Sequence, residues 1–159
     1  MMRMSFPEIV RIYQKPLYWY IRSVVLVHED SEDILQETFI KAYKHLWALR
    51  NPDSLKPWLY RIATNEMNRY FGRRRLAVPL EKVTLDEVVA QESVSEGEVT
   101  QIISSAVLRM TPLQRQVFRL KYYEDLDYEQ ISRITGSSVN SLTVSYHEAR
   151  KKIEQEIEK

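Results

Sequence analysis

The sequence predicts an all-α protein of two small helical domains, an N-terminal helical bundle and a C-terminal helix-turn-helix domain, joined by a flexible acidic linker. Apolar residues recur with helical spacing in both halves of the chain, and no strand-like alternation of useful length interrupts them. Glycine is scarce, with 3 in 159 residues, so helix ends are marked mainly by capping patterns. We expect the domains at residues 1–75 and 98–159, with the linker at residues 76–97.

The first helix has a clear start and an internal proline. Ser5 and Glu8 stand three residues apart, as in a capping box, directly before an apolar series that runs from Ile9 to Val24. Pro16 lies inside this series and lacks the backbone N–H that a helix interior needs. We therefore expect Pro16 to kink or split the helix.

Two further helices complete the N-terminal bundle. Asp30 or Ser31 is expected to cap the second helix, which presents an apolar face as far as Leu46. Asn51-Pro52-Asp53 is a turn signal. The third helix is expected from about Leu55 to Arg75.

Charge divides the chain into three blocks. Residues 1–75 carry 13 Lys/Arg against 8 Asp/Glu, residues 76–98 carry 1 against 6, and residues 99–159 carry 9 against 8. The basic front half suggests a charged partner, although ordinary surface variation would give similar blocks. Residues 76–97 also lack a sustained apolar period, which favours a linker over a poorly patterned helix.

Four helices are expected beyond the linker. The first runs from about Glu98 to Met110, and Thr111-Pro112-Leu113-Gln114 then supplies a cap, a proline at the first helical position and a glutamine reaching back. Asp127-Tyr128-Glu129-Gln130 repeats the capping pattern. Gly136 is expected to end that helix, and Ser137-Ser138 to open the last one.

The last two helices have the outline of a helix-turn-helix, although any helical hairpin with a glycine turn would look alike. Ile131 and Ile134 are expected to pack against Leu142 and either Val144 or Tyr146. In this motif the first turns of the second helix meet base edges in the major groove. Candidate residues for base or phosphate contacts are Ser137, Ser138, Asn140, Ser141, Thr143, His147, Arg150 and Lys151, with Lys152 beyond them.

Two patterns in the N-terminal domain suggest binding surfaces. The segment from Asp30 to Phe39 mixes acids, an amide and apolar residues, which suits a protein contact, or else a solvated helix face. The third helix interleaves aromatic and basic residues and ends in Arg73-Arg74-Arg75. Bases stack on aromatic rings while cations hold the phosphates, so this helix favours single-stranded nucleic acid, unless its aromatic residues are simply core.

These segments together resemble the extracytoplasmic-function sigma factors of bacterial RNA polymerase. The resemblance rests on Asp30-x-x-Asp33-x-x-Gln36-Glu37-x-Phe39, on Pro57 to Asn65 with the following arginines, on Met110 to Phe118, and on Gly136 to Lys152. It covers both domains in the family's order. It implies a factor that binds core RNA polymerase and directs promoter-specific transcription initiation.

The resemblance also implies a role for each site. Core polymerase would be bound by Asp30, Asp33, Gln36, Glu37 and Phe39. A flipped base of the melted minus-ten element, and its strand, would be held by Asn51, Asp53, Ser54, Lys56, Trp58, Arg61, Asn65, Arg69, Arg73, Arg74 and Arg75. The last helix, with the eight residues from Ser137 to Lys151 named above, would read the minus-thirty-five element. The linker would thread towards the RNA exit path, and an anti-sigma factor between the domains is the expected inhibitor.

Two departures from the family pattern affect specificity. Thr143 and Ser145 stand where many members carry Lys or Arg, and Glu148 replaces a basic residue, so the recognition helix is poor in charge. Arg69 stands where an Asp or Asn is common, which leaves the minus-ten base preference open.

Other functions fit less well. A plain helix-turn-helix regulator would leave the Asp30–Phe39 pattern and the aromatic-basic helix unexplained. An enzyme is not expected, because no phosphate loop or nucleophile motif occurs and His28, His45 and His147 lack metal-ligand spacing. We therefore expect no cofactor, metal or small-molecule substrate. The chain has no cysteine, no apolar run long enough to span a bilayer and no secretory signal at its start, so we expect a cytoplasmic protein without membrane insertion.

Overall fold

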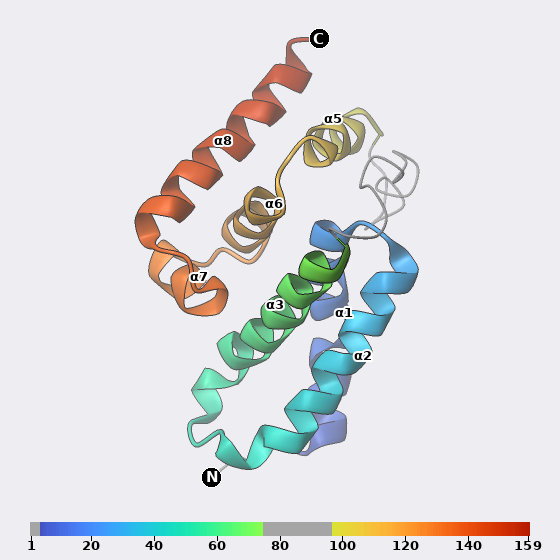
Figure 1. Cartoon of the computed structure of the whole chain (residues 1–159), viewed down its shortest axis with the longest axis vertical. Coiled ribbons are helices and arrows are strands. Elements are labelled where there is room, and N and C mark those ends of the chain that lie inside the picture. The colour runs from blue at the N-terminus through green and yellow to red at the C-terminus, as the bar shows by residue number, and fades with distance from the viewer. Residues whose placement is uncertain (1–3, 75–96) are drawn as a thin grey trace.

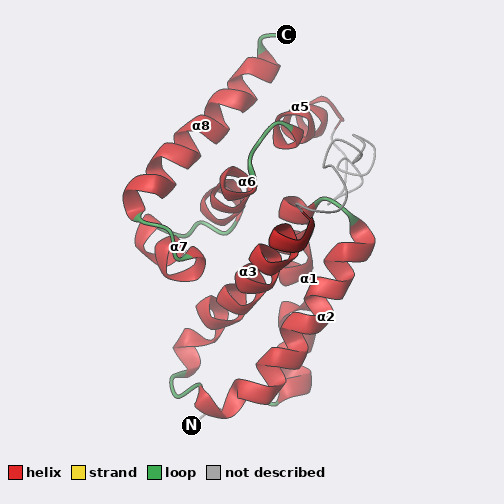
Figure 2. Cartoon of the chain, viewed as in Figure 1, coloured by secondary structure: helices red, strands yellow, loops and turns green. Residues whose placement is uncertain are grey.

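The computed structural model describes residues 4–74 and 97–159. Within these ranges every regular element is a helix, as Figures 1 and 2 show. The predicted linker lies outside the described residues except for Gly97. The elements are α1 (Phe6–Val25), α2 (His28–His45), the short 3-10 turns η1 (Leu46–Ala48) and η2 (Pro52–Ser54), α3 (Leu55–Arg74), α5 (Gly97–Leu108), α6 (Pro112–Phe118), the π-helical turn η4 (Arg119–Tyr123), α7 (Tyr128–Thr135) and α8 (Val139–Ile157).

Helix α1 confirms its predicted start but corrects the role of Pro16. The Ser5–Glu8 capping box is present in full. Pro16 lies inside the helix, which continues unbroken to Val25, so the expected split does not occur, whereas a kink at Pro16 stays a prediction. The residues that follow, Leu17, Tyr20 and Ile21, are all fully buried. Their packing outweighs the roughly 3 kcal/mol that an internal proline costs.

Helix α2 begins earlier than predicted, and neither proposed cap acts as one. Its N-cap is Val27, which makes no side-chain capping bond. Ser31 lies one turn inside, where its hydroxyl donates to the Val27 carbonyl at 2.7 Å. The Asp30 carboxylate accepts a hydrogen bond from the Tyr70 hydroxyl at 2.7 Å. This bond to α3 replaces the local bond that a cap would make.

The C-terminal helices begin and end largely as predicted. Both capping boxes, Thr111 with Gln114 and Asp127 with Gln130, are complete. Gly136 ends α7 in the left-handed conformation with φ +79°, where a Cβ would be strained. The sequence did not predict the π-helical turn η4 that continues α6.

The N-terminal module, α1 to α3, and the C-terminal module, α5 to α8, are docked on each other. Figure 1 shows α7 beside α3, and close contacts also join α1 to α6. One hydrophobic core runs through both modules and includes Leu59 and Tyr60 from α3 with Leu120 and Ile131 from the C-terminal helices. Leu26, which follows α1, is fully buried in a second core built from α5, α6 and α8. The two modules therefore share a hydrophobic core, and the N-terminal module also buries Leu26 in the core of the C-terminal module.

Candidate nucleic-acid and protein interfaces

Helices α7 and α8 form the predicted helix-turn-helix. Ile131, Ile134 and Leu142 are buried together in the main core, and Tyr146 packs against it. Val144 is 62% exposed, so Tyr146 is the partner and Val144 is not. The Ser138 hydroxyl accepts the Ser141 N–H at 3.1 Å and caps α8. The first turn of α8 therefore packs Leu142 into the core and leaves Asn140, Ser141 and Thr143 exposed.

Most of the predicted base-reading and phosphate-binding residues of α8 are accessible. The exposed side chains are those of Ser138, Asn140, Ser141, Thr143, His147, Arg150 and Lys151. Two of the serines have local roles, since Ser138 is the helix cap and the Ser137 carbonyl accepts from Ser132 Oγ at 2.6 Å. The Thr143 hydroxyl donates to the Val139 carbonyl at 2.8 Å, so its proton is not available for DNA.

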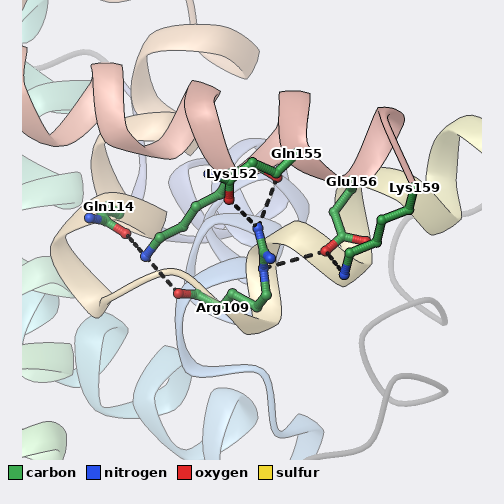
Figure 3. A network of polar contacts seen from close by, with 6 residues as sticks. All are labelled: Arg109, Gln114, Lys152, Gln155, Glu156 and Lys159. Carbon is green, nitrogen blue, oxygen red and sulfur yellow. Dashed lines mark hydrogen bonds and ion pairs between the residues drawn. The ribbon is translucent and has the colours of Figure 1, made fainter.

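A polar network anchors the far half of α8 to the turn between α5 and α6 (Figure 3). Arg109 Nη2 donates to the Lys152 carbonyl at 3.2 Å and to Gln155 Oε1 at 2.9 Å, and Arg109 Nε lies 3.4 Å from Glu156 Oε2. Lys152 Nζ donates hydrogen bonds to the Arg109 carbonyl and to Gln114 Oε1, both at 2.7 Å. Lys152 therefore supports the helix, and its expected contact with a phosphate stays a prediction.

The predicted protein-binding segment of α2 divides into two groups. Asp33, Gln36 and Glu37 are exposed and point away from the bundle. Asp30 is half-buried and engaged with Tyr70, and Phe39 is half-buried with its ring 6.3 Å from that of Phe6. The first group is available to a partner, whereas the second helps to hold α2 in place.

Helix α3 presents a basic stripe to solvent. Arg61, Asn65, Arg69 and Arg73 are exposed at intervals of four residues, whereas Trp58 is half-buried against the core. The preceding loop exposes Asn51 and Asp53, with Ser54 half-buried, and Asn51 Oδ1 accepts the Asp53 N–H at 3.0 Å. The side chain of Arg74 and the whole of Arg75 lie outside the described residues.

One predicted DNA contact is occupied by the other module. Lys56 Nζ lies 3.2 Å from Glu124 Oε1, which belongs to the segment after η4. Tyr60, one turn further along α3, is buried, and both burial and the nearby Glu124 carboxylate raise the pKa of its hydroxyl. The Tyr20 hydroxyl is hydrogen-bonded to Thr64 Oγ1 at 2.6 Å, and its pKa is raised by burial. This face of α3 is thus covered by the C-terminal module.

The residue that joins the modules most directly was not identified from the sequence. Arg115 on α6 is 1% exposed, and its Nε donates to the Val24 carbonyl at 2.8 Å, near the end of α1. Its Nη1 donates to the Met110 carbonyl at 2.6 Å, and burial lowers its pKa to about 10. The apolar periodicity of α6 could have shown only that Arg115 is a charged residue on a buried face of the helix.

Grooves that the sequence did not predict lie on the surface of the described residues. One, of about 590 Å³, lies between α1 and α2 and is lined by Arg11, Lys15, Trp19 and Arg22 among others. Another, of about 300 Å³, is lined by aromatic residues of the C-terminal module, including Phe118, Tyr122 and Tyr146.

In the described part of the chain, no cluster of three His, Asp or Glu residues suits a metal ion. Among the same residues, no helix is long and apolar enough to cross a bilayer.

Comparison with known proteins gives matches to both modules. The family model for Sigma-70 region 2 matches residues 9–76, and that for Sigma-70, region 4 matches residues 100–153. The ECF RNA polymerase sigma factor SigM of Bacillus subtilis is 24% identical over 153 residues, with 94% of this chain and 93% of the relative covered. SigW of the same organism is 27% identical over 167 residues, covering 96% and 89%.

A solved structure has the same fold. It is the sigma factor RpoE in complex with the anti-sigma factor NepR from Bartonella quintana, with a TM-score of 0.73, 20% identity and 96% of each chain covered.

Proposed function

Because the chain belongs to the sigma-70 family, as an extracytoplasmic-function sigma factor that directs promoter-specific transcription initiation, we propose that its two modules divide the promoter between them. The N-terminal module holds the melted minus-ten strand on the exposed stripe of α3. The C-terminal module reads the minus-thirty-five element with α8. The supporting observation is that each matched region presents its own exposed polar stripe within one chain.

The docked modules must separate before both elements can be bound. The two elements lie about 25 base pairs apart, which is roughly 85 Å of duplex. In the docked form α3 and α7 are in direct contact, and a compact chain of this length has a radius of gyration of only about 15 Å. We therefore assign the docked form to the free protein and an opened form to the polymerase-bound one.

From this function we infer that the protein acts by binding and catalyses no reaction. We also infer that it works in the cytoplasm, where RNA polymerase works. An anti-sigma factor is a further proposed partner, since the structurally similar RpoE is described in complex with NepR. An inhibitor inserted between the modules would have to displace Leu26 and Arg115 from their buried positions. One bound to the outer surface would keep the docked form intact.

The direct test is run-off transcription from a genomic DNA library by bacterial core polymerase, with and without this protein. New start sites that share two upstream elements are expected. If the protein binds duplex promoter DNA tightly alone and not core polymerase, it acts as a plain regulator and the proposal is wrong.

Core binding is predicted to depend on the exposed group on α2. Reversing two charges, in the double variant Asp33→Lys and Glu37→Lys, is expected to weaken binding to core polymerase by roughly 100-fold, because like charges across an interface cost several kcal/mol. Both residues are exposed, so the fold should be kept. Binding is measured by fluorescence anisotropy of labelled protein. The double variant Glu154→Lys and Glu158→Lys is the matched control, since it reverses two exposed charges at the far end of α8 and should leave binding unchanged.

The arginine run predicts the salt dependence of promoter binding. Changing Arg73, Arg74 and Arg75 together to Ala should reduce the slope of log affinity against log salt by about 2, if all three contact phosphates of a single strand. The measurement is holoenzyme affinity for a pre-melted promoter between low and moderate salt. Lys159→Ala, at the exposed end of the chain, serves as the control with no expected change in slope. An unaltered slope in the triple variant would show that these arginines do not contact the DNA phosphates.

A further inference from the structure

The outward face of α8 has an apolar residue at its centre. Asn140, Val144, His147 and Lys151 follow one another at intervals of four, three and four residues, so they share one side of the helix. All four are exposed, and Val144 is 62% exposed. The opposite side is occupied by Leu142 and Ala149, which are fully buried. Val144 is therefore part of the surface that faces DNA if α8 reads the major groove.

The basic residues of α8 lie beyond this position, in the later turns of the helix, and the nearest charged residue is Glu148, one turn from Val144. Lys151 lies 4.0 Å from Glu148, Arg150 lies over the Tyr146 ring at 6.0 Å, and Lys152 is held in the Arg109 network. Thr143 beside it has its hydroxyl proton on the Val139 carbonyl. The first two turns of the helix thus offer DNA an amide, short side chains and an exposed isopropyl group.

The apolar group that a major groove presents is the C5-methyl of thymine, and the side chain that reads adenine with two hydrogen bonds is Asn or Gln. We propose that Val144 selects a thymine in the minus-thirty-five element by packing on its methyl group, next to an adenine contacted by Asn140. The inference rests on the proposed role of α8 and adds to it the base that this charge-poor helix prefers. Specificity would then come from a methyl contact, in place of the Lys or Arg that many family members carry at the positions of Thr143 and Ser145.

The spacing of the two residues limits the spacing of the two bases. Asn140 and Val144 are one turn apart, which is about 6 Å along the helix axis. Base pairs are stacked about 3.4 Å apart, so the adenine and the thymine should lie within two base pairs of each other. The thymine can be on either strand, because the groove exposes the edges of both.

The test removes the methyl group from the DNA without altering base pairing. A promoter identified by run-off transcription is prepared with deoxyuridine in place of each minus-thirty-five thymine in turn, and holoenzyme affinity is measured. One position is expected to weaken binding about fourfold, the value of one buried methyl-sized group. Val144→Ala should weaken binding to the thymine promoter by a similar factor and should no longer distinguish thymine from deoxyuridine at that position.

Two variants make the result specific. Asn140→Ala should keep the sensitivity to deoxyuridine while losing preference at the neighbouring adenine. Val139→Ala changes the other exposed valine, which is 41% exposed and lies towards the edge of the face, and should keep full discrimination.

If no deoxyuridine affects wild-type protein, or if Val144→Ala retains the whole effect, the methyl contact is refuted while the role of α8 stands. If the holoenzyme initiates equally well with its minus-thirty-five element replaced, the role of α8 fails as well.

Discussion

Replacing Leu26 by Asp is expected to separate the two modules while each keeps its helices. Leu26 belongs to the N-terminal module in sequence but is fully buried with Ala106, Met110 and Phe118 of the other module. A carboxylate at this position would have to be desolvated without a partner, which costs several kcal/mol. Because the cost is confined to the docking surface, the chain can avoid it by opening.

Small-angle X-ray scattering measures the separation directly. The wild-type chain should have a radius of gyration near 15 Å, whereas the Leu26→Asp variant should be clearly larger. Its far-UV circular dichroism should be almost unchanged. Its affinity for core polymerase should rise, because the free energy that holds the docked form closed no longer opposes binding.

A second variant separates the side chain from the backbone. Leu26 has a positive φ of 74°, a conformation that costs a non-glycine residue about 1–2 kcal/mol. Leu26→Gly relieves this strain but loses the buried side chain, worth about 2–5 kcal/mol. It should therefore open the chain less than Leu26→Asp. An unchanged radius in both variants, or loss of helicity in either, would show that Leu26 does not control docking.

Local features of the fold could be predicted because local contacts determine them. Ser5, Thr111 and Asp127 cap their helices through residues three positions away, and Gly136 ends α7 through its own backbone. Asp30 or Ser31 was expected to cap α2, yet Ser31 lies one turn inside the helix and Asp30 bonds to Tyr70, 40 residues away. The bond of Asp30 could not be predicted because its partner is distant in the sequence.

Which part of each candidate site is available also depends on distant contacts. The pattern around Asp33, Gln36 and Glu37 was sufficient to propose a partner-binding face, and these residues are exposed. It could not show that Phe39 packs near Phe6 or that Lys56 faces Glu124, 68 positions further along the chain. The apolar periodicity of a sequence shows which face of a helix is buried, but it does not show how two modules are placed relative to each other. Leu26 and Arg115 therefore could not be identified as docking residues.

The second large effect is expected at Arg115, whose guanidinium joins the modules through its hydrogen bond to the Val24 carbonyl. Its Nε and Nη1 donate to the carbonyls of Val24 and Met110, 91 and 5 positions away. Burial lowers its pKa to about 10, so the group remains charged at neutral pH at some desolvation cost. Arg115→Ala removes the charge but leaves two buried carbonyls without this donor. The net loss in free energy of unfolding should be about 3–5 kcal/mol.

Chemical denaturation followed by circular dichroism gives this value, and two variants identify its origin. Arg115→Lys keeps a charge but, as a single ammonium group, cannot reproduce the guanidinium fork, so an intermediate loss is expected. Gln116→Ala removes the neighbouring residue, which donates to Asn68 at 3.3 Å, and should cost only about 1 kcal/mol. If Arg115→Ala costs no more than Gln116→Ala, the guanidinium only fills space, and docking depends on Leu26 and the shared core instead. A larger loss at Arg115, partly restored by Lys, would mean that the modules are joined by a buried charge, which core polymerase must displace to open the chain.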